Sequence, residues 1–536
     1  IYGMDHWGKL FNSRQKLSLV VLMDALRKRI EHDKINDFDK AIFTYLGICI
    51  DRLADYNSTL TTWVSNGEFV GHTFTKQALP MIWDYCEINP NSQATGDWNS
   101  SINWVRRVIE NNSFAVSNPS VITNQSATDL KYPENYFDAV FTDPPYYNSV
   151  PYADLSDFFY SFLKRSIGEL YPELFSTPMT PKSLEITEMI GWDPIRYPNK
   201  DKFFFENNLK KAFQEIYRIL KVGGIATIVY AHKSTEGWET VINALLDSNL
   251  IVTGSYPLNT EMQMRMRAKD SATLSSSIYI IVRKLPKEGT GFYNEVREEL
   301  KNYLNNKLNQ LWGEGIVGAD FFIAAIGSAI EVFGKYENVI DYEGNLKRAN
   351  SLLDDVREIV MNYTVAHILH NGFSGEVSEL TKFYVLYRFS YGESKLSFDE
   401  ANKLARSVGI DLSQEFNRDG FIKKEKEFVR VLTANNRKIE DLKDKTELID
   451  VLHHSVLLWE SRKKDKMMEL LADTGFGKSE AFFRVAQAIS ESLAKTSPES
   501  REKKLLDGFL GSKERIKSDI TNTKVTKKNI QGKLEF

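Results

Sequence analysis

The chain has 536 residues, enough for two to four domains, and its 42% hydrophobic and 26% charged residues are typical of globular proteins. A formal charge of −4 excludes a global basic field, so any contact with nucleic acid must come from local basic patches. The two isolated cysteines, Cys49 and Cys86, exclude a disulfide framework and a Cys-x-x-Cys zinc site.

No apolar run reaches membrane-spanning length, and no signal peptide is visible. Together with the cysteine usage, this pattern predicts a cytoplasmic protein without membrane contact and without a metal site. Because the first residue is Ile1 and not Met, we expect the chain to begin inside a longer natural sequence.

Residues 1–115 predict a helical N-terminal segment or lid. Apolar residues recur at helical spacing between residues 14 and 62, as in Leu17, Val20, Val21 and Leu26. The pair Arg14-Gln15 begins the first of these helices. Residues 66–113 mix turn signals with aromatic residues, which we interpret as packing residues.

Residues 116–285 alternate predicted strands and helices, which favours an α/β fold with the second half of a doubly wound sheet. The predicted strands cover residues 120–124, 137–142, 225–230, 251–255 and 277–283. The predicted helices cover residues 154–164, 203–220 and 237–246, and Gly223-Gly224 is expected to cap the second of them.

Residues 286–495 predict a mainly helical C-terminal domain, in which Ser397 to Glu400 resembles a capping box. Residues 496–536 hold more basic than acidic residues and few apolar ones, so we expect a partly disordered basic tail. The segment from Ala472 to Ser479 resembles a phosphate-binding loop. It has Ala where that motif needs its first glycine, and a helical pattern precedes it, so we do not expect an ATP site.

The most specific stretch is Asp143-Pro144-Pro145-Tyr146-Tyr147, which follows the predicted strand 137–142. Two prolines cannot continue a parallel strand, and they stiffen the chain where an open α/β sheet places its ligand crevice. Asp143 and the nearby carbonyl groups offer acceptors, and Tyr146 offers a flat face for stacking. These groups suit a planar base with an exocyclic amine, such as a flipped adenine.

With this motif the sequence resembles the adenine-specific DNA methyltransferases. It is most similar to the large methylases that carry a zinc-ribbon insert and often occur in phage-defence gene clusters. The resemblance is carried by Gly3-Met4-Asp5, Leu10-Phe11-Asn12-Ser13-Arg14-Gln15, Asp143-Pro144-Pro145-Tyr146-Tyr147, Tyr152 to Tyr160, Leu220-Lys221-Val222-Gly223-Gly224, Tyr230-Ala231-His232-Lys233 and Ser276-Ser277-Ile278-Tyr279. The resemblance spans most of the chain and is strongest between Asp129 and Lys284.

The resemblance implies a Rossmann-like fold that uses S-adenosyl-L-methionine, double-stranded DNA as substrate, and a role in a restriction-like or antiviral defence system with partner subunits. It implies that Asp143, Pro144, Pro145 and Tyr146 are catalytic. Asp129, Leu130 and Asp143 would then contact the cofactor. The expected reaction transfers a methyl group to the exocyclic N6 of adenine, with Asp143 and the Pro144 carbonyl holding the amine.

One part of such a fold is absent from the sequence. A cofactor-binding sheet needs a first strand that ends in a glycine-rich turn, and no such turn precedes Asp143. Without the first strands, the strand 137–142 would have an open edge. We therefore expect the missing part upstream of Ile1 or on a partner chain.

The candidate substrate-binding residues are Tyr147, Tyr152, Lys233, Arg265 and Arg267. Lys164 and Arg165 are further basic residues that suit phosphates. Asp154 and Asp157 are expected to cap the helix 154–164 or to line the pocket, with capping favoured.

Two alternatives stay open at this point. An RNA or protein-glutamine methyltransferase more often carries Asn in place of Asp143. A non-catalytic, DNA-binding scaffold subunit would explain the absent glycine-rich turn. The sequence does not specify the recognition site, the oligomeric state or the partner proteins.

Overall fold

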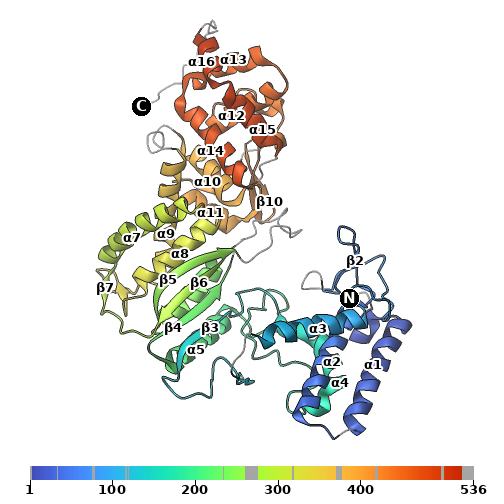
Figure 1. Cartoon of the computed structure of the whole chain (residues 1–536). Helices are drawn as coiled ribbons and strands as arrows, with labels where there is room; N and C mark the ends of the chain where they lie inside the picture. Colours follow the sequence, from blue (N-terminus) through green and yellow to red (C-terminus); the bar gives the residue numbers. More distant parts are fainter. Residues whose placement is uncertain are drawn as a thin grey trace. The chain divides into compact units, whose positions relative to one another are not determined.

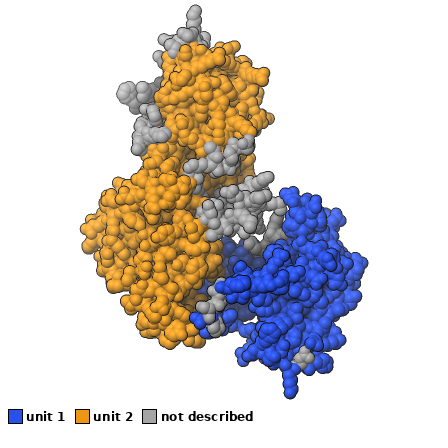
Figure 2. Space-filling view, viewed as in Figure 1, with its two compact units in different colours: residues 1–125, 148–201 blue, residues 126–147, 202–536 orange. Residues whose placement is uncertain are grey.

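The computed structural model describes residues 3–32, 34–74, 79–114, 118, 120–232, 235–259, 276–316, 319–369, 377–416, 420–496 and 500–521. The chain forms two compact units, coloured separately in Figure 2. Unit 1 comprises Ile1–Gln125 and Asn148–Asp201, and unit 2 comprises Ser126–Tyr147 and Lys202–Phe536. The described fold is mixed α/β with more helix than strand.

Unit 1 is built from helices around an apolar core (Figure 1). Its elements are η1 (Trp7–Leu10), α1 (Ser13–His32), α2 (Asp37–Tyr56), β1 (Trp63–Val64), β2 (Phe69–Val70), α3 (Trp98–Ser113), α4 (Tyr152–Ile167) and η2 (Gly168–Leu170). The helices predicted between residues 14 and 62 are confirmed. The buried face of α1 differs from the predicted one, because Leu19, Met23 and Leu26 are buried whereas Leu17 is 64% exposed.

The sheet of unit 2 has the order β3-β4-β6-β5 (Figure 1). Its strands are β3 (Phe137–Thr142), β4 (Leu220–Tyr230), β5 (Ile251–Asn259) and β6 (Ser276–Arg283). β3 pairs with β4 in parallel, and β6 lies antiparallel between β4 and β5. β3, β4 and β5 therefore run in one direction, and β3 is an edge strand. Helices α5 (Lys202–Ile219) and α6 (Thr235–Leu246) connect these strands.

One face of this sheet is fully buried. Ile228 and Tyr230 of β4 and Ile280 of β6 are completely inaccessible. Helix α8 (Ala319–Phe333) comes close to this face at Gly327, where a Cβ atom would lie 2.8 Å from Ser255 and 3.2 Å from Ile278.

The opposite face is less covered. It carries Tyr279 and also Phe141, which is 67% exposed. Tyr256, which pairs with Tyr279, is 56% exposed. Within the described ranges, the sheet is therefore well covered on one face and open both at the β3 edge and over the Phe141 face.

Two local predictions in this region are wrong. Residues 120–124 form no strand, and Val121 and Ile122 are 84% and 91% exposed, because no neighbouring strand pairs with them. Gly223-Gly224 do not cap a helix, since α5 ends at Ile219 and β4 begins directly at Leu220. The two glycines lie inside β4 at an irregularity of its pairing with β3, where Gly223 has a φ of +77°.

The rest of unit 2 is mainly helical, as predicted for residues 286–495. Its helices are α7 (Tyr293–Gly313), α8, α9 (Ala349–Ile368), α10 (Glu379–Tyr391), α11 (Phe398–Arg406), α12 (Leu448–Glu460), α13 (Lys464–Asp473), α14 (Glu480–Thr496), α15 (Arg501–Gly511) and α16 (Lys513–Thr521). Its short strands are β7 (Gly291–Phe292), β8 (Val339–Ile340), β9 (Leu396–Ser397), β10 (Ile422–Glu425) and β11 (Phe428–Val431). Ser397 caps α11 as predicted. The predicted tail is ordered over α15 and α16, where Phe509 and Ile516 are buried.

The helical part of unit 2 contains buried ion pairs. Arg388 of α10 and Glu502 of α15 are 3% and 5% exposed, and Arg388 Nη2 donates to Glu502 Oε2 over 2.6 Å. Arg437 Nη1 donates to Asp450 Oδ1 over 2.6 Å and also approaches His453 Nδ1 at 3.2 Å. Burial and the nearby Arg437 hold the pKa of His453 well below its usual value, so the ring is neutral.

The segment that resembles a phosphate-binding loop is a corner between two helices. α13 precedes it, Gly475 has a φ of +75°, and a 3-10 turn, η7 (Phe476–Lys478), leads to α14. A Cβ atom on Gly477 would lie 1.9 Å from Ile520 Cδ1, so this glycine allows close packing against α16. Since the loop follows a helix and not a strand, its geometry excludes the phosphate-binding motif, as predicted.

Candidate functional site

The Asp143–Tyr147 segment leaves the sheet at the carboxyl end of β3, beside the carboxyl end of β4. Asp143 is exposed, and no described residue forms a hydrogen bond or ion pair with its carboxylate. Pro144 and Pro145 are half-buried and have no N–H to donate. The Asp143 carboxylate and the two prolines therefore offer acceptor groups at the place where parallel strands commonly bind ligands.

Two residues of β4 and its extension hold this segment. His232 Nε2 lies 2.8 Å from the Tyr147 carbonyl oxygen, so the ring donates to it. The Tyr147 N–H points at the Tyr230 hydroxyl, which lies 3.4 Å away, and that hydroxyl donates to Gly237 O over 3.0 Å. Burial raises the pKa of Tyr230, so its hydroxyl stays protonated. These contacts fix the backbone of the motif relative to the neighbouring strand.

The two tyrosines of the motif have different surroundings. Tyr147 is 7% exposed, its ring contacts Phe205 edge-on, and its hydroxyl donates to Glu236 Oε1 over 3.1 Å. Tyr146 is half-buried, and its ring meets that of Tyr230 at 5.1 Å in an edge-to-face arrangement. Tyr146 is therefore the more accessible aromatic surface next to Asp143.

His232 is a site residue to which sequence reasoning assigned no function. Its ring stacks parallel to Tyr230 at 6.4 Å, and its carbonyl accepts a hydrogen bond from Trp238 Nε1 over 3.0 Å. Its position just after β4 could have predicted that it lies near the Asp143 segment. The carboxyl ends of adjacent parallel strands meet at one edge of a sheet. The neighbouring Lys233, a predicted substrate-binding residue, lies outside the described residues, as do Arg265 and Arg267.

Asp129 and Leu130 are not brought to Asp143. Leu130 N donates to Glu215 Oε2 over 2.9 Å, and Arg218 Nη2 donates to Leu130 O over 2.7 Å. Both partners lie in the last turns of α5, which lead into the amino end of β4, whereas Asp143 follows the carboxyl end of β3. The six residues of β3 span about 20 Å. The exposed Asp129 carboxylate pairs with Lys131.

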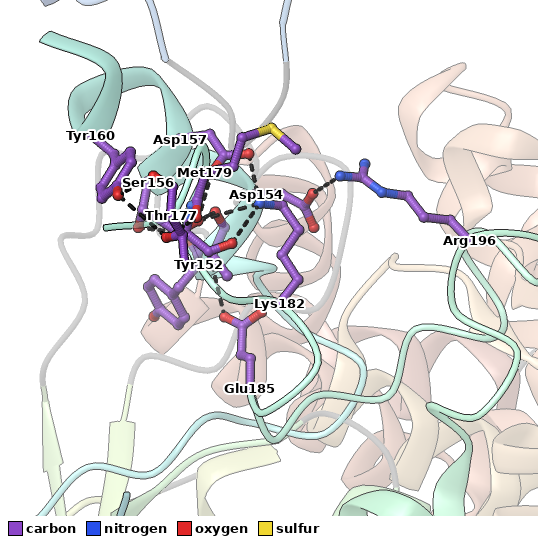
Figure 3. A network of polar contacts seen from close by, with 12 residues as sticks. Tyr152, Asp154, Ser156, Asp157, Tyr160, Thr177, Met179, Lys182, Glu185 and Arg196 are labelled. Carbon is purple, nitrogen blue, oxygen red and sulfur yellow. Dashed lines mark hydrogen bonds and ion pairs between the residues drawn. The ribbon is translucent and has the colours of Figure 1, made fainter. Parts of the chain in front are cut away.

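Tyr152 begins α4 in unit 1 and is 60% exposed. The helix has no side-chain cap, so the capping role predicted for Asp154 and Asp157 is wrong. Glu185 Oε1 accepts from the Ala153 N–H over 2.9 Å instead. Figure 3 shows these residues together with the segment that they hold.

Asp154 and Asp157 bind the segment 177–200 to α4. The Asp154 carboxylate accepts from the Tyr197 hydroxyl over 2.7 Å. It also pairs with Arg196 at 3.0 Å (Figure 3). Asp157 accepts from the Thr180 N–H over 2.9 Å and pairs with Lys182 at 2.6 Å. Burial acts to raise the pKa of Asp157, but the hydrogen bonds from Lys182 and Thr180 outweigh it and hold the pKa below its usual value.

Further chemistry in the described ranges is limited. No group of three His, Cys, Asp or Glu side chains there is arranged to hold a metal ion. Cys49 is buried, which raises the pKa of its thiol to about 11 and keeps it protonated. No helix within these ranges is both long and apolar enough to cross a membrane.

Comparisons of the chain with protein-family models, with curated proteins and with solved structures found no match. The methyltransferase resemblance therefore rests on the residues quoted above.

Proposed function

We propose that the protein is an S-adenosylmethionine-dependent methyltransferase that modifies the exocyclic N6 of adenine in DNA. The observation that carries this proposal is the exposed, unengaged carboxylate of Asp143 on a diproline turn at the carboxyl end of β3. A carboxylate beside two proline carbonyl groups offers acceptors that suit a neutral amine with two N–H groups.

In the proposed mechanism, Asp143 and the Pro144 carbonyl each accept one N–H of the amine. These contacts draw the nitrogen lone pair out of conjugation with the ring and direct it away from the two acceptors. Tyr146 stacks on the flipped base, while the buried Tyr147 and His232 keep the turn in place. S-adenosylmethionine would supply the methyl group at a sulfonium centre.

The described residues fit the amine-holding half of this site and not the cofactor-holding half. Asp129 and Leu130 contact α5 at the amino end of the parallel strands, and no glycine-rich turn lies near Asp143. The unpaired edge of β3 and the exposed Phe141 are consistent with completion of the sheet by another segment or another chain. We propose that this addition holds the cofactor.

The test uses the full-length protein, an Asp143→Ala variant and an Asp138→Ala variant as control. Asp138 lies on the same strand and pairs with Lys221 at 2.7 Å at the surface. Each protein is incubated with unmethylated plasmid and labelled S-adenosylmethionine, and the nucleosides are then identified. We expect label in N6-methyladenine from the full-length protein and from the Asp138→Ala variant. Asp143→Ala is expected to lower the rate at least about 100-fold.

Other outcomes select other functions. If the full-length protein binds the cofactor but labels no DNA, transfer to RNA or to a protein glutamine replaces the proposal. Absence of cofactor binding by the full-length protein supports the scaffold function, which the open β3 edge also favours. Equal loss of label in both variants would exclude a specific role for Asp143.

A further inference from the structure

Unit 1 contains a half-open cavity of about 560 Å³ between the last turns of α1 and α4. Arg27 and Ile30 line it from α1, and Lys164 and Arg165 line it from α4. The remaining lining residues are Ser166, Gly168, Glu169 and Pro178. Its volume lies in the range of ligand-binding pockets, but its lining contains no aromatic ring.

Two of the three cations in this cavity, Lys164 and Arg165, have no carboxylate partner among the described residues, whereas Arg27 has two. Arg27 approaches Glu169 only at 3.8 Å and Glu31 at 3.7 Å. Three cations therefore face one carboxylate in the lining, which leaves a net positive charge.

Cations are common in the last turn of a helix, where they interact with free carbonyl groups. Arg165 Nη1 donates to Ser161 O over 2.7 Å, and Lys164 Nζ donates to Thr177 O over 2.5 Å. Each contact uses one N–H of a group that has several, so donors and charge are left for a ligand. Arg27 adds a third cation from a different helix, α1, and reaches Glu169 across the cavity at 3.8 Å.

The segment that carries Pro178 is held against α4 by the network of Figure 3. The Thr177 carbonyl oxygen accepts the hydrogen bond from Lys164 Nζ. It also accepts one from the Tyr160 hydroxyl over 2.6 Å. Thr180 is bound by Asp157 over 2.6 Å through its hydroxyl. Pro178 lies between these two fixed residues, so the cavity is a built feature of unit 1.

We propose that this cavity binds a phosphate of the DNA backbone. The inference rests on the proposed function and adds a contact that positions the duplex. Cations without a stacking ring recognise a phosphate and not a base, which is typical of contacts that fix register without reading sequence. The DNA backbone is preferred over a free nucleotide for the same reason.

The test compares two charge reversals in the full-length protein. Arg27→Glu/Arg165→Glu changes the cavity. Lys28→Glu/Arg106→Glu changes the formal charge equally at surface residues that pair with Asp24 and Glu110. Binding of unmethylated duplex DNA is measured over a series of salt concentrations. If thermal unfolding shows that the Arg27→Glu/Arg165→Glu variant does not fold, the Arg27→Gln/Arg165→Gln variant is used in its place.

The cavity variant is expected to weaken binding at least about tenfold on every sequence and to lower the salt slope by about 1 to 2, with about 0.9 for each lost phosphate contact. The control should keep the wild-type slope. Equal losses in both variants would show that only net charge matters.

A calorimetric titration with inorganic phosphate distinguishes the source of the ligand. If the cavity variant loses phosphate binding but keeps wild-type DNA binding, the cavity serves a small phosphorylated ligand and the inference is wrong. The cavity variant could instead methylate DNA, bind DNA and bind phosphate as the wild type does. This result would exclude the cavity as a phosphate site but leave the proposed function intact. If the wild-type protein neither binds nor methylates DNA, the proposed function is overturned together with this contact.

Discussion

Charged residues are used in opposite ways in two regions of unit 2. At the end of β3, Asp143 is exposed and has no partner among the described residues. In the helical region of α10, α12 and α15, Arg388 and Glu502 are almost completely buried and joined at 2.6 Å. A buried charge without a partner would cost several kcal/mol, so neither member of such a pair can be removed alone without a large loss of stability. An exposed carboxylate contributes little to folding, so the stability of the protein does not require Asp143.

The strongest test of this comparison removes one partner of the buried pair. Arg388→Leu leaves the Glu502 carboxylate buried and should lower the free energy of unfolding by about 3 to 5 kcal/mol. Arg388→Met/Glu502→Leu should recover most of this loss. Asp143→Ala should leave stability unchanged. Denaturant titrations measure all three, and an equal loss in the single and double variants of the pair would contradict a role for the uncompensated charge.

A second test applies the same substitution in both regions. Phe509 is completely buried among Trp459, Phe482 and Phe483, whereas Phe141 on β3 is 67% exposed. Phe509→Ala should cost about 3 kcal/mol because it opens a cavity. Phe141→Ala should cost less than about 1 kcal/mol. A large loss for Phe141→Ala would mean that its ring is covered in the free protein.

Asp51 on α2 of unit 1 is an exception to the pairing of buried charges. It is buried, but its Oδ1 has no partner among the described residues. Burial raises the pKa of Asp51 to about 8. Since the folded-state pKa lies above the unfolded value of about 3.9, stability should fall as the pH rises from about 4 to about 8.

Asp51→Asn should remove that pH dependence and raise stability at pH 8 by about 2 kcal/mol. Thermal unfolding of the wild-type protein and the Asp51→Asn variant at several pH values measures this difference in stability. The neighbouring Asp55, which pairs with His72 at 2.6 Å and is partly exposed, offers a control through Asp55→Asn. A wild-type curve that is flat between pH 4 and pH 8 would exclude the raised pKa.

The smallest expected effect concerns the protection of backbone amides. β6 is paired on both sides, so its amides should exchange with solvent slowly. β3 is paired only with β4, so the amides that face its free edge should exchange much faster. Hydrogen exchange followed by mass spectrometry measures this difference. If a partner chain completes the sheet, adding it should slow exchange in β3 and leave β6 unchanged.

The sequence predicted the strands of the sheet and the position of Asp143 because apolar, β-branched runs and a diproline turn are local signals. It did not predict Leu19 and Met23 as the buried face of α1, since that helix has apolar residues on both sides. It also missed the contacts of His232 with Tyr147 and of Asp154 with Tyr197, which join residues 85 and 43 positions apart. Such contacts depend on tertiary packing, which no local pattern encodes.

The free edge of β3 also limits what can pair with it. The strand has six residues, and Pro144 and Pro145 block its continuation. Near its other end, Asp138 is paired with Lys221. An added strand therefore has few possible alignments, and a slip by one residue would exchange its inward and outward side chains. The free edge of β3 would therefore accept an added strand in few registers.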